Sequence, residues 1–229
     1  MKTNILGQLL TDRAAKRQVV VATDLTNGDG QLIYPAESDA ADDLNIAARR
    51  VMVADKSGVV ELADGRKLFL HVHNPPLRML VVGAVHIAQS LAEMARLAGF
   101  QVVVVDPRQA FARSDRFVGI EISTDWPDQA LEQLGLDGRT AVVTLTHDPK
   151  LDDPALDAAL ASPAFYIGSL GSKKTHRARL ERLASRGFAE SDRERIRGPV
   201  GLSIGSVTPA EIAVSILAEV IRALRSDSS

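Results

Sequence analysis

Three short segments hold residues that could do chemistry: two combine flexible glycines with histidine, hydroxyl or cationic side chains, and one sets a histidine between a hydroxyl and a carboxylate. They are Gly83-Ala-Val-His86, Thr146-His147-Asp148 and Gly168-Ser169-Leu-Gly171-Ser172-Lys173-Lys174. The third would present backbone N–H groups and two lysines at the start of a helix, which favours an anion such as phosphate. The second sets a histidine beside a carboxylate, so it could bind a ligand, transfer a proton or hold a loop.

Each of these segments also has a simpler structural explanation. The third is not a Walker A loop, because two residues instead of four separate Gly168 from Gly171. It could be a glycine turn before a solvated basic helix, although residues 168–200 hold nine Lys and Arg against four Asp and Glu. That excess of basic charge suits an anionic ligand or an acidic partner. Asp148 before Pro149 is equally an ordinary turn residue, and His86 could simply face solvent.

Other candidate chemistry is weaker. Thr208 and Glu211 have the spacing of a capping box, which favours capping over acid or base catalysis by Glu211. The glycine-rich segment 198–205 before it has few side chains to bury and is expected to lie against a ligand or another backbone. His71 and His73 share a strand face but lack a third ligand, so we expect no metal site.

The segment around Gly83 predicts a Rossmann-like βαβ unit. An apolar strand at 79–82 meets Gly83, a helix follows through Ala98, and a second strand at 102–105 closes on Asp106. Asp106 has the spacing of a ribose-binding carboxylate, and Arg108 follows it. Val85 stands where the dinucleotide pattern has a second glycine, which disfavours a nicotinamide dinucleotide.

Further strands and helices alternate after this unit. Strands are expected at 118–122, 140–145 and 164–167. Helices are expected from Asp125-Trp126-Pro127, from Asp152-Asp153-Pro154 to Leu160, over 172–185, and from Pro209, with Thr208 as N-cap, through an apolar stripe that ends at Leu224. This alternation predicts an α/β fold, with a Rossmann-like parallel sheet covered by helices on both faces. In such sheets ligands bind beyond the carboxyl ends of the strands, where the three segments would converge.

The first part of the chain is expected to form a separate small domain. A helix at 5–10, strands at 19–22 and 32–34, a helix at 42–53 and a hairpin of 59–62 with 67–72 predict an α+β domain over residues 1–76. Residues 77–229 would form the Rossmann-like domain, since His73-Asn-Pro-Pro76 is typical of a boundary. A domain this small needs a neighbour for stability, which favours a homodimer.

Composition excludes several classes of protein. The 229 residues carry a net charge of −2, which gives no overall electrostatic attraction to nucleic acid or to an anionic membrane. The sequence contains no cysteine. We find no apolar run long enough to span a membrane and no secretory signal, and therefore expect a cytoplasmic protein.

Five segments resemble the XdhC/CoxI family of maturation factors for molybdenum hydroxylases. They are 81–86, 102–108, 146–156, 166–174 and 198–215. The resemblance implies a dimeric chaperone that binds molybdenum cofactor while its sulfur ligand is installed and then passes it to an apo-hydroxylase such as xanthine or CO dehydrogenase. Molybdopterin and its cytosine dinucleotide form carry phosphate, which would suit residues 168–174. By position, Gly83, His86, His147 and Asp148 would line the pterin or dinucleotide pocket, and Val85 and Thr146 are further candidates for cofactor contact.

The chain departs from this family in its first domain, which is short and lacks the usual Gly-Gly-Cys motif. A thiol for molybdenum or sulfur contact would have to come from a partner, such as a sulfur donor. Two alternatives stay open. One is an NAD(P)-dependent oxidoreductase that uses Asp106 and His147, and the other is a regulatory module that senses a nucleotide.

Overall fold

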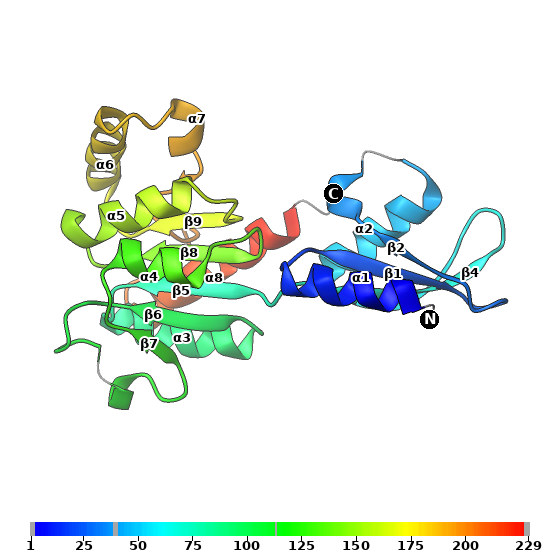
Figure 1. Cartoon of the computed structure of the whole chain (residues 1–229). Coiled ribbons are helices and arrows are strands. Elements are labelled where there is room, and N and C mark those ends of the chain that lie inside the picture. The colour runs from blue at the N-terminus through cyan, green and yellow to red at the C-terminus, as the bar shows by residue number, and fades with distance from the viewer. Residues whose placement is uncertain (1–2, 39–40, 113, 227–229) are drawn as a thin grey trace. The chain divides into compact units, whose positions relative to one another are not determined.

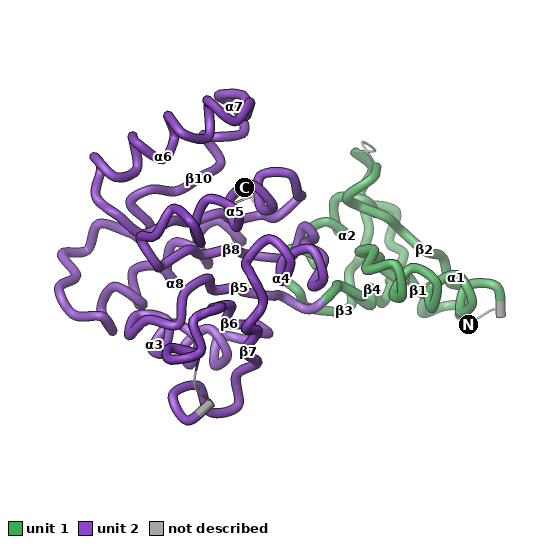
Figure 2. The backbone as a smooth tube through the Cα atoms, turned by 60° about the vertical axis from the view of Figure 1, so that its left-hand side comes forward, with its two compact units in different colours: residues 1–75, 225–229 green, residues 76–224 purple. Residues whose placement is uncertain are grey.

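The computed structural model describes residues 3–38, 41–112 and 114–226. The chain forms two compact units, which divide it between residues 75 and 76 and again between 224 and 225 (Figure 2). Each unit has a sheet and a hydrophobic core of its own.

The first unit is built on a four-stranded antiparallel sheet in the order β2-β1-β4-β3. Its elements are α1 (Thr3–Ala14), β1 (Val19–Asp24), β2 (Gly30–Ile33), α2 (Asp43–Ala54), β3 (Gly58–Glu61) and β4 (Lys67–His73), with a 3-10 turn at Pro35–Glu37. Alternate residues of β1 face opposite sides, so Val20 packs in the core with α2 while Val19 and Val21 pack with Leu9 of α1. The predicted hairpin is confirmed, because Glu61 pairs with Lys67 across the turn at Asp64-Gly65.

The second unit contains a six-stranded parallel sheet in the order β10-β9-β8-β5-β6-β7 (Figure 1). The strands are β5 (Arg78–Val82), β6 (Gln101–Val105), β7 (Glu121–Ser123), β8 (Thr140–Thr144), β9 (Tyr166–Ser169) and β10 (Ile196–Arg197). The central strands are almost entirely apolar and buried, as expected for a sheet covered on both faces.

Helices cover both faces of this sheet. They are α3 (His86–Leu97), α4 (Pro127–Leu134), α5 (Pro149–Leu160), α6 (Lys173–Ser185), α7 (Glu190–Arg193) and α8 (Pro209–Ser226), and a 3-10 turn spans Ser114–Arg116. One core joins α3 and α8 to strand residues such as Val81, and the other joins α4, α5 and α6 to strand residues such as Leu80 on the opposite face (Figure 1). The predicted α/β fold is confirmed. Among the described residues, no helix combines the length and apolar character needed to cross a membrane.

The start of the strand expected at 118–122 is wrong, because Val118 and Gly119 form a turn and β7 begins at Glu121. Two other local features differ from the predictions. The helix expected from Asp152 begins at Pro149, with Asp148 as its N-cap, so the prediction of its start is wrong. Asp148-Pro149 already supplies a capping side chain and a proline at the first helical position, and Pro154 lies inside the helix. The second difference is that two short elements were not predicted: the edge strand β10, of two residues, and the helix α7, of four residues. Both are too short to show a periodic hydrophobic pattern.

Candidate functional site

The three candidate segments follow β5, β8 and β9, which are neighbours in the sheet. Because these strands are parallel, the loops at their carboxyl ends lie along the same edge, and the expected convergence is confirmed. The strand order reverses direction between β5 and β8, since β6 and β7 lie on one side of β5 and β8 to β10 on the other. Ligands of open α/β sheets bind at such a switch point.

Gly83 joins the first two loops closely. Its φ of +109° is a conformation that favours glycine, and a Cβ at this position would lie 2.6 Å from Cγ2 of Thr146. The backbone after β5 therefore packs directly on the loop after β8, and a larger residue at position 83 would push the two loops apart.

The turn from β5 into α3 exposes backbone donors. Val85 is the N-cap of α3 and makes no side-chain capping bond, and His86 is exposed at the first helical position. Within the described chain, no acceptor binds the N–H of Val85 or His86. The neighbouring N–H of Ala84 is already used, because it donates to Oδ2 of Asp106 at 2.8 Å.

Asp106 is enclosed by its own chain. Its side chain is fully buried, and Arg108 donates to it through the backbone N–H at 3.0 Å, Nε at 2.9 Å and Nη2 at 2.8 Å. Burial alone would raise the pKa of this carboxyl, but the hydrogen bonds from Arg108 and Ala84 outweigh it and lower the pKa. Both carboxylate oxygens thus tie β6 to the turn after β5, and Arg108 is committed to the same contact.

The loop after β8 presents His147 in an uncommon conformation. The φ of His147 is +62°, and the residue is exposed. Oγ1 of Thr146 holds the loop, because it accepts from the N–H of Asp148 at 3.1 Å and donates to Oδ1 of Asp152 at 2.6 Å. Asp148 caps α5 by accepting from the N–H of Lys150 at 3.0 Å. Non-glycine residues with positive φ are concentrated at functional sites.

The loop after β9 divides into a buried and an open part. Gly168 and Ser169 are buried, and a Cβ on Gly168 would lie 2.5 Å from Val200 and 2.8 Å from Tyr166, so this glycine serves packing. The hydroxyl of Ser169 bonds that of Thr144. Further along, Gly171 has a φ of +145°, Ser172 caps α6 by accepting from the N–H of Thr175 at 3.1 Å, and Lys173 and Lys174 are exposed.

A buried pair that the sequence analysis did not identify connects the second and third loops. Asp152 of α5 and Arg179 of α6 each have side chains only 2% exposed, and Nη2 of Arg179 lies 4.0 Å from Oδ2 of Asp152. Asp152 binds Thr146, while Nη2 donates to the carbonyl of Leu170 at 2.8 Å. Burial raises the pKa of Asp152, although Thr146 and Arg179 oppose that shift. No local pattern indicates this pair, since the two residues are brought together only by the fold.

Two more arginines of α6 bind aspartates of α5. Arg182 donates to both oxygens of Asp153 at 2.8 Å, and Arg186 pairs with Asp157. These contacts, with the pair of Arg179 and Asp152, form the arginine–aspartate ladder. Only two residues of α6, Arg179 and Leu183, are buried, and Leu180 packs partly buried against the same core, so the ladder adds polar contacts to a small apolar attachment.

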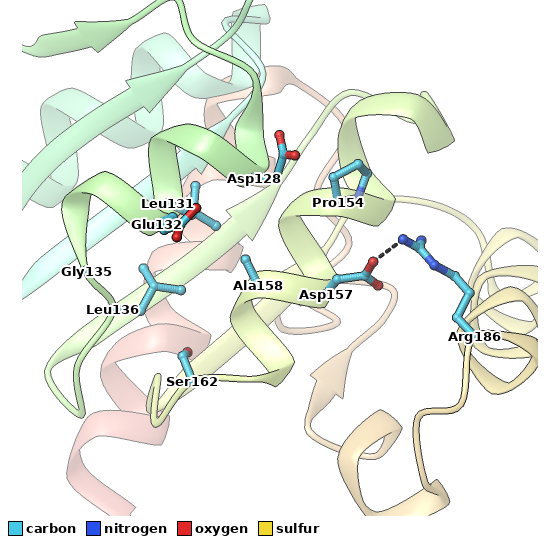
Figure 3. A pocket seen from close by; sticks show the side chains of 10 residues that line it. All are labelled: Asp128, Leu131, Glu132, Gly135, Leu136, Pro154, Asp157, Ala158, Ser162 and Arg186. Carbon is cyan, nitrogen blue, oxygen red and sulfur yellow. Dashed lines mark hydrogen bonds and ion pairs between the residues drawn. The ribbon is translucent and has the colours of Figure 1, made fainter.

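A surface pocket of about 520 Å³ lies between α4 and α5. Figure 3 shows the side chains that line it, with the pair of Arg186 and Asp157 at one side. Its lining contains none of the candidate residues of the three loops. This pocket lies on the flank of the helix layer and is distinct from the loop edge.

The remaining candidates have structural partners. Glu211 forms the predicted capping box, because Oε2 accepts from the N–H groups of Val207 and Thr208 at 2.7 and 3.0 Å, which lowers its pKa. In the glycine-rich segment, Gly201 packs on α8, where its Cβ would lie 2.4 Å from Oγ of Ser215 and 3.2 Å from the backbone N of Ile216. Residues 203–205 are exposed, and a Cβ on Gly205 would have no neighbour within 4 Å, so the prediction of close backbone contact holds only for part of this segment. The described residues contain no group of three or more His, Cys, Asp or Glu that could hold a metal ion.

Comparison with known proteins gives related sequences. Residues 79–220 match the family described as the XdhC Rossmann domain. The molybdenum cofactor insertion chaperone PaoD of Escherichia coli (strain K12) is 32% identical over 146 residues, which are 64% of this chain and 40% of PaoD. A probable xanthine dehydrogenase subunit of Bacillus subtilis (strain 168) is 33% identical over 156 residues, 68% of this chain and 45% of that protein. The chain thus spans less than half the length of these two relatives.

A solved structure supports the same relationship. The crystal structure of a xanthine dehydrogenase from Bacillus halodurans is similar with a TM-score of 0.69 at 25% identity, over 96% of this chain and 66% of that chain. The strand order, the loop edge and the match over residues 79–220, more than half of the 229 residues, agree with the resemblance found from sequence. The chain therefore belongs to the XdhC family.

Proposed function

We propose that this chain binds molybdenum cofactor at the loop edge of its parallel sheet and assists maturation of a molybdenum hydroxylase. In this proposal the chain holds the cofactor while a sulfur donor supplies the terminal sulfur ligand, and then passes it to an apo-enzyme of the xanthine or CO dehydrogenase type. Membership of the XdhC family and similarity to PaoD, a molybdenum cofactor insertion chaperone, support this role.

The observation that carries the proposal is the grouping of anion-binding groups at one switch point. Free N–H groups of Val85 and His86, the exposed His147 and the lysines at positions 173 and 174 all belong to adjacent strand ends. Molybdopterin is phosphate-bearing, so backbone donors and ammonium groups suit it. We infer that the cofactor is cargo here, held by hydrogen bonds and charge.

Two candidate acids are already held by hydrogen bonds within the chain, which supports a binding role over a catalytic one. Glu211 caps a helix, and both oxygens of Asp106 are taken up by the chain. An NAD(P)-dependent oxidoreductase would use Asp106 for a ribose hydroxyl and would need space at Val85, so neither feature favours that alternative. We further propose a cytoplasmic homodimer, in line with the small size of the first unit.

The decisive experiment is a calorimetric titration of the purified full chain with molybdopterin, its cytosine dinucleotide, NAD(H) and NADP(H). We expect binding of at least one molybdopterin form and no response to the nicotinamide cofactors. Replacing both lysines, as Lys173→Gln with Lys174→Gln, should weaken this binding about tenfold, since two charge-assisted contacts are lost. Tight nicotinamide binding without a molybdopterin response would overturn the proposed function.

A further inference from the structure

Arg179 is buried with unused hydrogen-bond donors. Its side chain is 2% exposed, and Nη2 donates to the carbonyl of Leu170 at 2.8 Å. Neither Nε nor Nη1 has a hydrogen-bond partner among the described residues. A buried donor without a partner is costly, and a native structure that keeps one usually does so for a reason.

The guanidinium of Arg179 lies directly beneath the open part of the loop after β9. A Cβ on Gly171 would lie 3.7 Å from Nη2, an ordinary contact distance, and 3.1 Å from Thr175, so the backbone of this loop lies close to the guanidinium. Above it, the N–H groups of residues 171–174 have no acceptor within the described chain. The loop after β9 therefore combines free backbone N–H groups at the amino terminus of α6 with a buried guanidinium close to its backbone.

We propose that Arg179 and the N–H groups of residues 171–174 form an oxyanion site that takes a phosphate group. The backbone N–H groups bind the phosphate oxygens, Arg179 supplies a fixed positive charge beneath them, and Lys173 and Lys174 add charge from solvent. This inference rests on the proposed function and deepens it, because it assigns the phosphate end of the cofactor to this loop.

The alternative place for a phosphate, the turn after β5, is less suited. Val85 occupies the position where a glycine would let backbone approach the phosphate, and the N–H of Ala84 is bound to Asp106. The loop after β9 keeps its donors free and has a buried cation that the turn after β5 lacks within its described contacts.

Asp152 positions the guanidinium and links the site to the loop that carries His147. Its Oδ2 lies 4.0 Å from Nη2, while its Oδ1 binds Thr146.

The test is calorimetric titration of the full chain with inorganic pyrophosphate at low ionic strength. We expect saturable binding that Arg179→Gln weakens at least about tenfold and that Arg179→Lys partly restores. The matched control is Arg177→Gln, an exposed arginine of the same helix, which should change affinity by less than about twofold. Failure of the wild-type chain to bind pyrophosphate, or unchanged affinity in folded Arg179→Gln, would overturn the proposal.

A second variant decides the matter if Arg179 proves necessary for folding. Gly171→Ala keeps Arg179, but its φ of +145° is strained for alanine and its methyl group would press on Thr175, so it should displace the N–H groups of this loop and also reduce pyrophosphate affinity. Retained affinity in Gly171→Ala, with the Arg179 variants unfolded by circular dichroism, would refute the site. Pyrophosphate contains no pterin, so the chain could bind pyrophosphate and still fail to bind molybdopterin, which would contradict the proposed function alone. If the chain binds molybdopterin with the same affinity in wild type and Arg179→Gln, only the phosphate site proposed here is contradicted.

Discussion

At the scale of single residues, Asp106 shows how a candidate ligand-binding acid is used by the chain itself. Its carboxylate accepts from Ala84 and Arg108 while fully buried. Asp106→Asn leaves Arg108 without its anionic partner, so we expect the free energy of unfolding to fall by about 3 kcal/mol at neutral pH. Urea denaturation would measure this, with the exposed Asp128→Asn as the control.

The same contact predicts a pH dependence. The folded pKa of Asp106 is lowered, so its stabilisation is present above its unfolded pKa of about 3.9 and is lost as pH falls through the folded value. The difference in stability between wild type and Asp106→Asn should therefore shrink below about pH 4. A difference that stays constant to pH 2 would show that the ionised carboxylate is not responsible.

Gly83 gives a prediction about the contact between two loops. Gly83→Ala should destabilise the chain, because its methyl group would meet Cγ2 of Thr146 and its φ of +109° is strained for alanine. Thr146→Ser removes that Cγ2 but keeps the hydroxyl that binds Asp152. The double variant, Gly83→Ala with Thr146→Ser, should have a higher melting temperature than Gly83→Ala alone. If the effects of the two changes on stability simply add, the contact between Gly83 and Thr146 is contradicted.

At the scale of elements, α5 depends on its cap. Asp148→Ala removes the acceptor for the N–H of Lys150 and should cost about 1 kcal/mol, whereas Asp148→Asn retains a capping oxygen and should cost less. Chemical denaturation of the three proteins would measure this. If Asp148→Asn and Asp148→Ala lowered the free energy of unfolding equally, Asp148 would stabilise the helix through its charge and not through its capping hydrogen bond.

Elements with strong local signals were predictable from the sequence. Pro127 and the Thr208–Glu211 box mark helix starts that the structure confirms, since these contacts form within one turn. The two-residue β10 carries no periodicity of its own and exists only because β9 offers it a partner. The contact of Asp152 with Arg179 joins separate helices, so no spacing rule could indicate it.

At the scale of the whole molecule, the small first unit supports an expectation of self-association. Val59 of β3 is 60% exposed and Phe69 of β4 is 37% exposed on that unit. Sedimentation equilibrium should give about twice the monomer mass of 24.6 kDa. Val59→Lys with Phe69→Lys should shift the mass toward the monomer if this apolar surface contributes, while Lys at the exposed Leu97 of α3 is the control.

The arginine–aspartate ladder makes the candidate phosphate loop sensitive to its ionic surroundings. Arg182 and Arg186 are 39% and 40% exposed, and the Debye length shortens from about 10 Å at 0.1 M salt to 3 Å at 1 M. Added electrolyte should therefore loosen the hold of α5 on α6 and increase amide hydrogen exchange along that helix before the sheet opens. Dissolved salt would then set the mobility of a single helix while the rest of the unit stays folded.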